Sequence, residues 1–243
     1  MGSTCDRQKP HSDQCRFTRH AQLVLIIPSL ALLFTSGLLM AAAAVAPLKL
    51  PDGLVQEMSD HYGPEARVRL LSWQLMVKEQ AAVLEWQRLQ HINAFLNRIP
   101  FAEDQDHWHQ QDYWATPVQF LASNGGDCED FAIAKLFSLQ GANIDPDKLR
   151  LMYVTAKELG QAHMVLLYRA NSGEHPLVLD NMTGEIMAAR DRTDLAPVYS
   201  FNASGLWLNK RTEQNEHEVK VRNHSGSSLW RELVARMEKE GVL

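Results

Sequence analysis

The feature that most constrains the fold is an apolar helical run that begins directly after a pair of glycines. Gly125 and Gly126 break the backbone, and a helix is expected from Cys128 to about Gln140, with Gly141 as its C′ residue. The large apolar side chains of this run point to all sides of the helix: Phe131, Ile133, Leu136, Phe137 and Leu139. A helix that is apolar all round is buried. The sequence therefore predicts a domain built around this segment.

Cys128 stands at or next to the N-terminus of the central helix. Unpaired N–H groups and the helix dipole favour negative charge there, so a thiol ionises more readily. A thiolate is the nucleophile of cysteine hydrolases. The alternative is a buried structural cysteine, the commoner role of a cysteine taken at random. The glycine-rich entry, the first-turn position and the flanking acids favour the nucleophile.

The first residues have the three parts of a secretory signal. Basic residues precede an apolar run over residues 23–40, and small residues follow at 41–46. We therefore interpret residues 1–44 as a signal peptide or, because the run is long enough to cross a bilayer, as an uncleaved signal anchor. Either form predicts a periplasmic or otherwise exported domain that touches the membrane only through this segment.

Cysteine content and net charge argue against an internal disulfide and against a nucleic-acid partner. Cys5 and Cys15 lie in the leader, so the exported part keeps Cys128 alone and can form no internal disulfide. The net charge is −5 and the basic residues form no stripe, which argues against nucleic acid as a partner.

The remaining pattern predicts an α+β fold, with helices before the glycine pair and strands after the central helix. One long helix is expected over 64–99, with Val68, Leu71, Leu75 and Trp86 on its buried face. The expected strands are 149–156, 163–170, 176–182 and 197–202, and the first three form an antiparallel meander.

The C-terminal part of the sequence is more polar than the part that precedes it. Residues 209–226 are polar and predict a mobile linker, and an amphipathic helix follows over 229–239 with Ser228 as N-cap. The predicted organisation is a leader over 1–44, a globular domain over 45–208, and a linker with a C-terminal helix over 209–243.

Three residues in these elements could form a catalytic triad. A cysteine hydrolase needs a base for the thiol proton and a third group that orients the base. His163 begins the second strand and Asp180 lies late in the third, so pairing of the strands would bring them together. Asn181 is the rival orienter, but it points to the opposite face of the sheet. The Cys128 backbone N–H would hold the oxyanion, and a second donor from residues 108–114 stays open.

The acids around Cys128 allow two interpretations. Asp127, Glu129 and Asp130 would raise the pKa of the thiol by repulsion, and a bound calcium ion would remove that conflict. Acids are also favourable in any first helical turn, without a metal. On chemical grounds alone, the calcium site and the metal-free helix terminus are about equally well supported. A metal site at His107 and His109 is the weaker option, because no second ligand pair at metal spacing follows.

Five separated blocks carry a resemblance to a known family: residues 112–117 (DYWATP), 126–135 (GDCEDFAIAK), 161–166 (QAHMVL), 177–181 (LVLDN) and 197–202 (PVYSFN). They resemble the bacterial transglutaminase-like cysteine proteinases, in particular the LapG-type periplasmic proteases of biofilm-forming bacteria. The resemblance implies a papain/transglutaminase-like fold. It also implies a triad of Cys128, His163 and Asp180, and calcium held by Asp127, Glu129 and Asp130.

The same resemblance implies a substrate and a regulator. Family members cleave the N-terminal region of a large surface adhesin at a paired-alanine site and so promote biofilm dispersal. An inner-membrane receptor for cyclic di-GMP sequesters the protease. The residues alone leave two other functions open: an acyl-transferase, in which an amine replaces water at the thioester, and a non-catalytic binding module that retains the groove.

Overall fold

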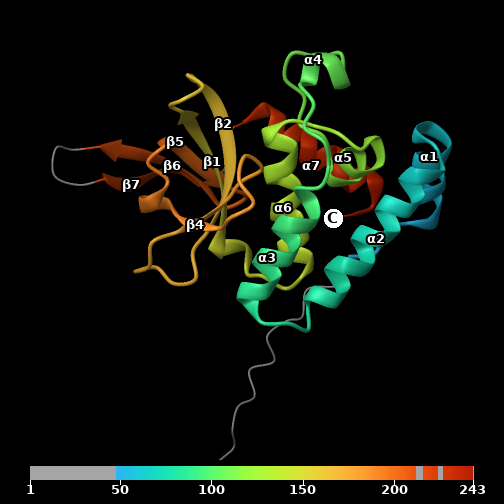
Figure 1. Ribbon diagram of the computed structural model, residues 1–243, viewed down its shortest axis with the longest axis horizontal. Helices are drawn as coiled ribbons and strands as arrows, with labels where there is room; N and C mark the ends of the chain where they lie inside the picture. Colours follow the sequence, from blue (N-terminus) through green and yellow to red (C-terminus); the bar gives the residue numbers. More distant parts are fainter. Residues whose placement is uncertain (1–47, 212–215, 224–226, 243) are drawn as a thin grey trace, which may run out of the picture. The chain divides into compact units, whose positions relative to one another are not determined.

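The central helix expected from the sequence is α6 (Cys128–Gly141), and it lies between a sheet and the other helices (Figure 1). The computed structural model describes residues 48–211, 216–223 and 227–242. Phe131, Ile133 and Leu136 of α6 are buried. The predicted burial of this helix and the α+β class are therefore confirmed. The elements that pack against it are β1 (Leu149–Ala156), β2 (Gln161–Tyr168), α2 (Pro64–Gln80), α3 (Glu85–Leu96) and α5 (Pro117–Ser123).

The end of α6 differs slightly from the expectation. Gly141 is the last helical residue rather than the C′ residue, and the left-handed conformation falls on Asn143, with φ 63°. Asparagine tolerates this region better than most residues. The short 3₁₀ turn η1 (Pro146–Lys148) then leads into β1.

The prediction of one helix over 64–99 was wrong, because α2 and α3 are separated by a turn at residues 81–84. The Arg88 side chain folds back over this turn and donates to the carbonyl oxygens of Ala81, Val83 and, beyond α6, Ala142. These bonds satisfy carbonyls that a helix end leaves open. The apolar spacing continues across the turn, which contains neither glycine nor proline, so periodicity alone does not reveal it. A further helix, α1 (Asp52–Tyr62), precedes α2.

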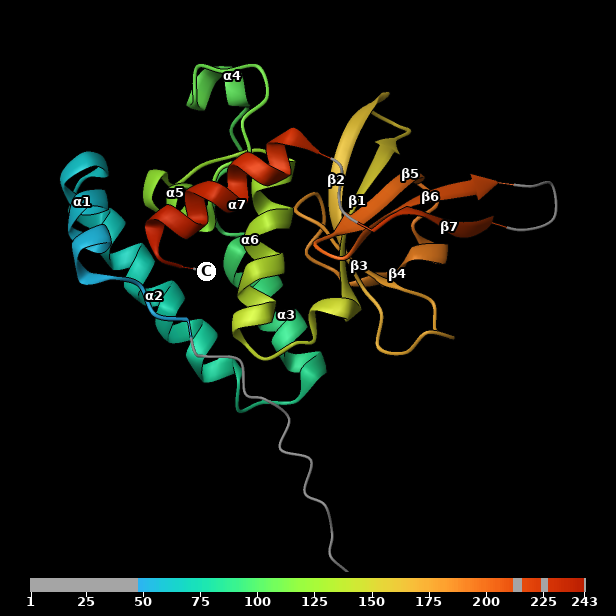
Figure 2. The ribbon, with the colours of Figure 1, turned by 180° about the vertical axis from the view of Figure 1, so that it is seen from behind.

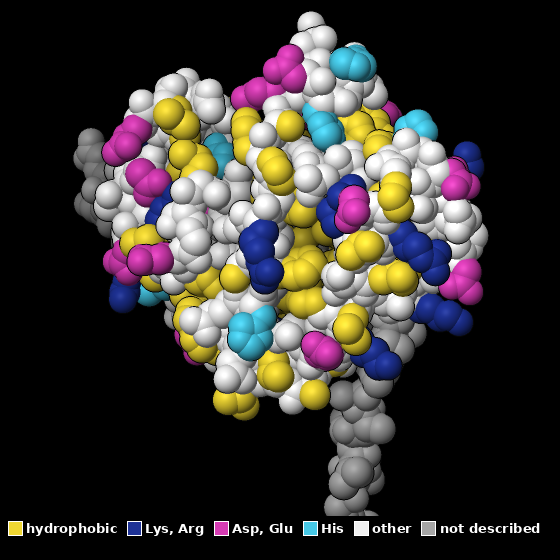
Figure 3. All heavy atoms as spheres, turned by 45° about the vertical axis from the view of Figure 1, so that its right-hand side comes forward, with side chains coloured by type: hydrophobic (Ala, Val, Ile, Leu, Met, Phe, Trp, Pro, Cys, Tyr) yellow, Lys and Arg dark blue, Asp and Glu magenta, His cyan; other side chains and the backbone are white. Residues whose placement is uncertain are grey.

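The expected buried face of α2 was also wrong. Val68, Leu71 and Leu75 are 57%, 40% and 56% exposed, whereas Leu70 and Trp73 are buried. Trp73 Nε1 donates to Ser138 Oγ of α6 at 2.7 Å, so the bulkiest side chain of α2 also finds a polar partner in the core. Figure 3 brings the α2 side forward and shows hydrophobic side chains gathered around a hollow on this face.

Strands after α6 form one sheet with the order β4-β3-β2-β1-β5-β6-β7. The meander of β1, β2 and β3 is antiparallel, as predicted. Leu151 of β1 pairs with Leu166 of β2, and Leu166 pairs with Leu179 of β3, which sets the register next to Asp180. In this sheet β3 spans Leu177–Leu179, β4 spans Met187–Ala188 and β5 spans Leu195–Asn202, and the 3₁₀ turn η2 (Ala189–Asp191) lies between β4 and β5.

The linker predicted over 209–226 was wrong, because much of it belongs to a hairpin. Strands β6 (Gly205–Arg211) and β7 (Glu216–Arg222) extend the sheet beyond β5. An edge hairpin is held by backbone hydrogen bonds and can carry polar side chains on its exposed face. Polarity alone therefore did not distinguish this hairpin from a linker.

The C-terminal helix was predicted correctly and is α7 (Ser228–Glu240), which lies in front of α6 and α5 in the view of Figure 2. Its N-cap is Ser227, one residue before the predicted Ser228, and Ser227 Oγ accepts the Trp230 N–H. Trp230 stacks on Phe137 of α6 with ring centroids 5.9 Å apart. The helix therefore covers the part of α6 around Phe137.

Within the described part of the chain, none of the helices is long and apolar enough to cross a membrane. The predicted leader over residues 1–44 lies outside that part, and its interpretation stays a prediction.

Candidate active site

The glycine pair is required by close approach on the way into α6. Helix α5 ends at Asn124, which adopts the left-handed conformation with φ 61°. A Cβ atom at Gly125 would lie 2.7 Å from His107 Cε1, and one at Gly126 would overlap the Asp130 side chain. Any larger residue here would push away the segment that carries His107 or the first turn of α6. The glycines therefore bring the start of α6 against the preceding loop.

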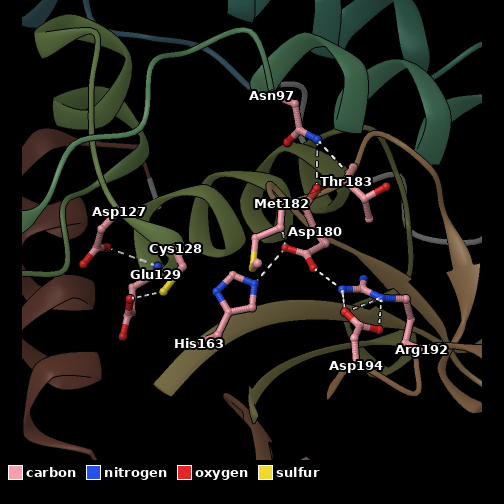
Figure 4. A network of polar contacts seen from close by, with 10 residues as sticks. All are labelled: Asn97, Asp127, Cys128, Glu129, His163, Asp180, Met182, Thr183, Arg192 and Asp194. Carbon is pink, nitrogen blue, oxygen red and sulfur yellow. Dashed lines mark hydrogen bonds and ion pairs between the residues drawn. The ribbon is translucent and has the colours of Figure 1, made fainter. Parts of the chain in front are cut away.

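Cys128 is the first residue of α6, as predicted. The Asp127 carboxylate caps the helix by accepting the Glu129 N–H at 3.2 Å. Because α6 packs on β2, the Cys128 sulfur lies close enough to that strand to accept a hydrogen bond from the Met164 backbone N–H. Met164 follows His163 directly, so the sulfur lies beside the part of β2 that carries the imidazole. Figure 4 shows Nδ1 of His163 turned toward Cys128.

His163 and Asp180 are joined as the sequence predicted. His163 is the third residue of β2, and its Nε2 lies 2.8 Å from Asp180 Oδ1. Asp180 follows β3 directly, and both side chains are buried. The Met182 backbone N–H donates to the same carboxylate oxygen at 3.0 Å, and Arg192 Nη2 donates to Oδ2 at 2.7 Å (Figure 4). Both carboxylate oxygens of Asp180 therefore have partners.

Electrostatics keep Asp180 ionised. Burial alone would raise the pKa of this carboxyl, but the hydrogen bond and charge of His163 and the donors from Met182 and Arg192 together lower the pKa below its usual range. An ionised Asp180 can accept the Nε2 proton of His163, which fixes the tautomer that leaves Nδ1 free to act as a base.

Asn181 does not replace Asp180. No hydrogen bond joins Asn181 to His163, and its Oδ1 is buried without a partner among the described residues. The 180–183 turn is instead fixed from α3, because Asn97 Nδ2 donates to the Asp180 carbonyl oxygen at 2.8 Å.

The thiol itself is held in its protonated form. Burial raises the pKa of Cys128, and the charge of Glu129, its hydrogen bond and the charge of Asp127 raise it further, whereas the Met164 N–H acts in the opposite direction. The thiol donates to Glu129 Oε2 at 2.7 Å, and Glu129 Oε1 accepts the Tyr153 hydroxyl at 3.1 Å. The repulsion expected from the flanking acids is therefore present.

The acids form two groups rather than one. Oxygen atoms of Asp104, Asp127 and Asp130 lie within 4.8 Å of one another. Glu129 belongs to a second group with Asp127 and the Cys128 sulfur. Asp104, in α4 (Asp104–His107), was not predicted as a ligand, whereas Asp127 and Asp130 were.

This first group has the properties of a cation site. Burial, followed by the charges of the other acids, raises the pKa of Asp127 to about 9. Burial is also the main cause that raises the pKa of Asp130 to about 8 and of Asp104 to about 6. Asp104 Oδ1 is buried and has no hydrogen-bond partner within the part of the chain that the structure describes. Three crowded carboxylates and an unpaired oxygen fit a hard cation such as calcium, which prefers oxygen ligands.

The two histidines considered as metal ligands do not take part. His107 Nε2 is 2.8 Å from Ser123 Oγ, and His109 is exposed with φ 57°. Neither belongs to a group of metal-ligating side chains within the described chain.

Together these features define a class of protein. A cysteine at the start of a buried helix, next to a histidine and an aspartate on an antiparallel sheet, is the arrangement of transglutaminase-like cysteine hydrolases. The family model described as bacterial transglutaminase-like cysteine proteinase matches residues 72–209. The chain belongs to this family.

Solved structures of Legionella pneumophila LapG are similar over most of the chain. One is 34% identical, covers 79% of this chain and 99% of its own, and has a TM-score of 0.63. An EGTA-treated form is also 34% identical, with coverage of 79% and 100% and a TM-score of 0.63. A calcium-bound form is 33% identical, with coverage of 75% and 98% and a TM-score of 0.62. A sequence search among curated proteins gives no match.

Proposed function

We propose that this protein is a calcium-dependent cysteine endopeptidase with a triad of Cys128, His163 and Asp180. The observation that carries the proposal is the 2.8 Å contact between His163 Nε2 and Asp180 Oδ1, on the strand against which the Cys128 helix packs. Family membership supports the protease activity.

Each residue of the triad has a defined task. His163 Nδ1 takes the proton from the Cys128 thiol, and the sulfur attacks the peptide carbonyl. The Cys128 backbone N–H, free at the helix start, stabilises the oxyanion. His163 then gives its proton to the leaving amine, which leaves a thioester on the sulfur. Water, deprotonated by His163, hydrolyses the thioester and restores the thiol, while Asp180 holds the imidazole throughout.

Asp104, Asp127 and Asp130 would hold the calcium ion. Bound there, calcium would neutralise the carboxylates beside the sulfur and so favour the thiolate. The choice of calcium as the ion is supported by the calcium-bound and EGTA-treated forms of the related Legionella LapG. Glu129 remains a candidate for an additional ligand through the second group that it forms with Asp127.

The substrate and control follow from the resemblance to LapG-type proteases. We infer that the exported, periplasmic enzyme cleaves the N-terminal region of a large adhesin at a paired-alanine site, which promotes biofilm dispersal. We also infer that an inner-membrane receptor for cyclic di-GMP sequesters it. The support for both inferences is the sequence resemblance and the similarity to Legionella LapG.

Cleavage of an adhesin fragment with paired alanines tests the proposal. We expect Cys128→Ala and His163→Gln to abolish cleavage, while His175→Gln, at an exposed histidine after β2, retains it. Loss of a nucleophile or base lowers the rate of such enzymes by about 10³-fold or more. Cleavage by Cys128→Ala, or full activity in a calcium chelator, would refute the corresponding part of the proposal.

Two further readouts separate the alternatives. A labelled amine added to the reaction would be incorporated into the substrate if the protein is an acyl-transferase. Alkylation of Cys128 by iodoacetamide in the presence of calcium would be absent if the protein is only a binding module. We expect hydrolysis without amine incorporation, together with alkylation of Cys128.

A further inference from the structure

Arg192 lies behind the triad, in the segment between η2 and β5. Its side chain is only 5% exposed, and its Nη2 donates to Asp180 Oδ2 at 2.7 Å. The opposite oxygen of the same carboxylate holds His163. Arg192 therefore contacts the orienting carboxylate through the oxygen that does not bind the imidazole.

Arg192 is itself held in place by Asp194. The Nε and Nη2 atoms of Arg192 lie 2.9 Å from Oδ1 and 2.7 Å from Oδ2 of Asp194, a two-point contact that fixes the plane of the guanidinium. A chain of charged contacts thus runs from Asp194 through Arg192 and Asp180 to His163 (Figure 4).

The pair of Arg192 and Asp180 within this chain is buried, with side chains 5% and 0% exposed. A buried guanidinium and a buried carboxylate are costly to desolvate unless each is paired, so breaking the pair is strongly unfavourable. Lys135 of α6 is a further basic side chain near Asp180, and it is also buried. Rotation of the Asp180 carboxylate would break its bonds to Arg192 and Met182 at once, so the orientation of His163 is coupled to Arg192.

We propose that Arg192 is a positioning residue for the peptidase reaction, which it serves by fixing the Asp180 carboxylate against His163. This inference rests on the proposed function. The competing explanation is a purely structural ion pair that attaches the segment before β5 to the sheet.

Kinetics with an internally quenched peptide that contains paired alanines distinguish the two explanations. We expect Arg192→Met to lower kcat by about 10–100-fold with KM changed less than about 2-fold, because orientation rather than binding is lost. Arg192→Lys keeps the charge but not the planar fork, so it should recover part of kcat. Arg190→Met is the matched control, since Arg190 lies in the same turn but is exposed and pairs with Asp191 at 3.7 Å.

A spectroscopic readout does not depend on the substrate. In the Cys128→Ala protein, the His163 Nε2 proton bonded to Asp180 should give a low-field NMR resonance, which His163→Gln assigns. We expect Arg192→Met to shift or broaden this resonance and Arg190→Met to leave it unchanged. If Arg192→Met does not fold, Arg192→Lys and Asp194→Asn decide the question by the same two measurements.

The outcomes separate this inference from the proposed function. An Arg192→Met protein with wild-type kcat and an unchanged resonance, or one with an effect on KM alone, would overturn the positioning role. So would Arg192→Lys and Asp194→Asn proteins that both match the wild type. Peptide cleavage by Cys128→Ala would instead overturn the proposed function, and the resonance would still report on Arg192.

Discussion

Replacing Asp104 with asparagine should stabilise the calcium-free protein and at the same time weaken calcium binding. Asparagine keeps an oxygen that can accept the Tyr113 N–H, which lies 2.6 Å from Asp104 Oδ2, so the local fold is retained. What is lost is one negative charge next to Asp127 and Asp130. The loss of this charge removes the cost of burying it in the calcium-free protein, and it removes part of the attraction for the ion in the calcium-bound protein.

The size of the first effect follows from the pKa of Asp104, which burial raises from 3.8 to about 6. Because the folded value is above the unfolded value, stability falls as the pH rises from about 4 to 6, and the full penalty remains at neutral pH. Two pKa units correspond to about 3 kcal/mol. Nearby solvent screens part of this, so we expect a gain of about 1–2 kcal/mol. For a domain of this size, that raises Tm by about 3–6 °C.

The size of the second effect follows from the number of charged ligands. Calcium affinity depends on how many carboxylates surround the ion, and the substitution leaves two of three. We expect Kd to rise by at least about 10-fold, or about 1.4 kcal/mol.

Thermal unfolding in EGTA and in calcium, together with calorimetric titration of calcium, measures both effects. Asp106→Asn is the control, because Asp106 lies in the same short helix but is exposed and outside the cluster. An Asp104→Asn protein with unchanged Kd, or with a lower Tm in EGTA, would refute the reasoning.

Three further predictions concern the acid cluster and the packing around α6. Calcium affinity should rise with pH between about 6 and 8, since binding displaces protons from Asp127 and Asp130, and calorimetry that shows no pH dependence would contradict this. Ser138→Ala leaves the Trp73 indole N–H without its partner and should lower the free energy of unfolding, measured in urea, by about 1–3 kcal/mol. A decrease below about 0.5 kcal/mol would contradict this prediction. Thr116→Val removes the capping box of α5 and should lower the free energy of unfolding by about 0.5–2 kcal/mol in the same measurement. An unchanged free energy of unfolding would show that the cap does not stabilise the protein.

The sequence predicted those parts of the site that local pattern determines. The glycine pair and the apolar run placed Cys128 at a helix start, and the strand pattern placed His163 on β2 and Asp180 at the end of the neighbouring strand, although β3 ends at Leu179, one residue before Asp180. The choice of Asp180 over Asn181 followed from the period of two along a strand. The hydrogen bond from His163 to Asp180 then needs only the correct register, which the meander provides.

Contacts between distant segments were not predictable in this way. Asp104 joins Asp127 and Asp130 because the loop before α5 folds over the start of α6, and a short acidic stretch gives no sign of that. Arg192 reaches Asp180 from a segment without regular periodicity. The available signal for Arg192 was weak: an arginine two residues before an aspartate, next to a predicted strand.

The two charged clusters on either side of Cys128 differ in their balance, and this difference indicates where calcium would act. On the sheet side, His163, Asp180 and Arg192 form a paired chain in which the carboxylate keeps both partners without a metal. On the loop side, burial and the neighbouring acids raise the pKa values of Asp127 and Asp130 to about 9 and about 8, so that these two carboxyls hold protons at neutral pH. Calcium removal should therefore change the charge next to the sulfur while leaving the bond between His163 and Asp180 intact. The low-field resonance of His163 in EGTA measures this directly, and its loss on calcium removal would show that the two clusters are coupled.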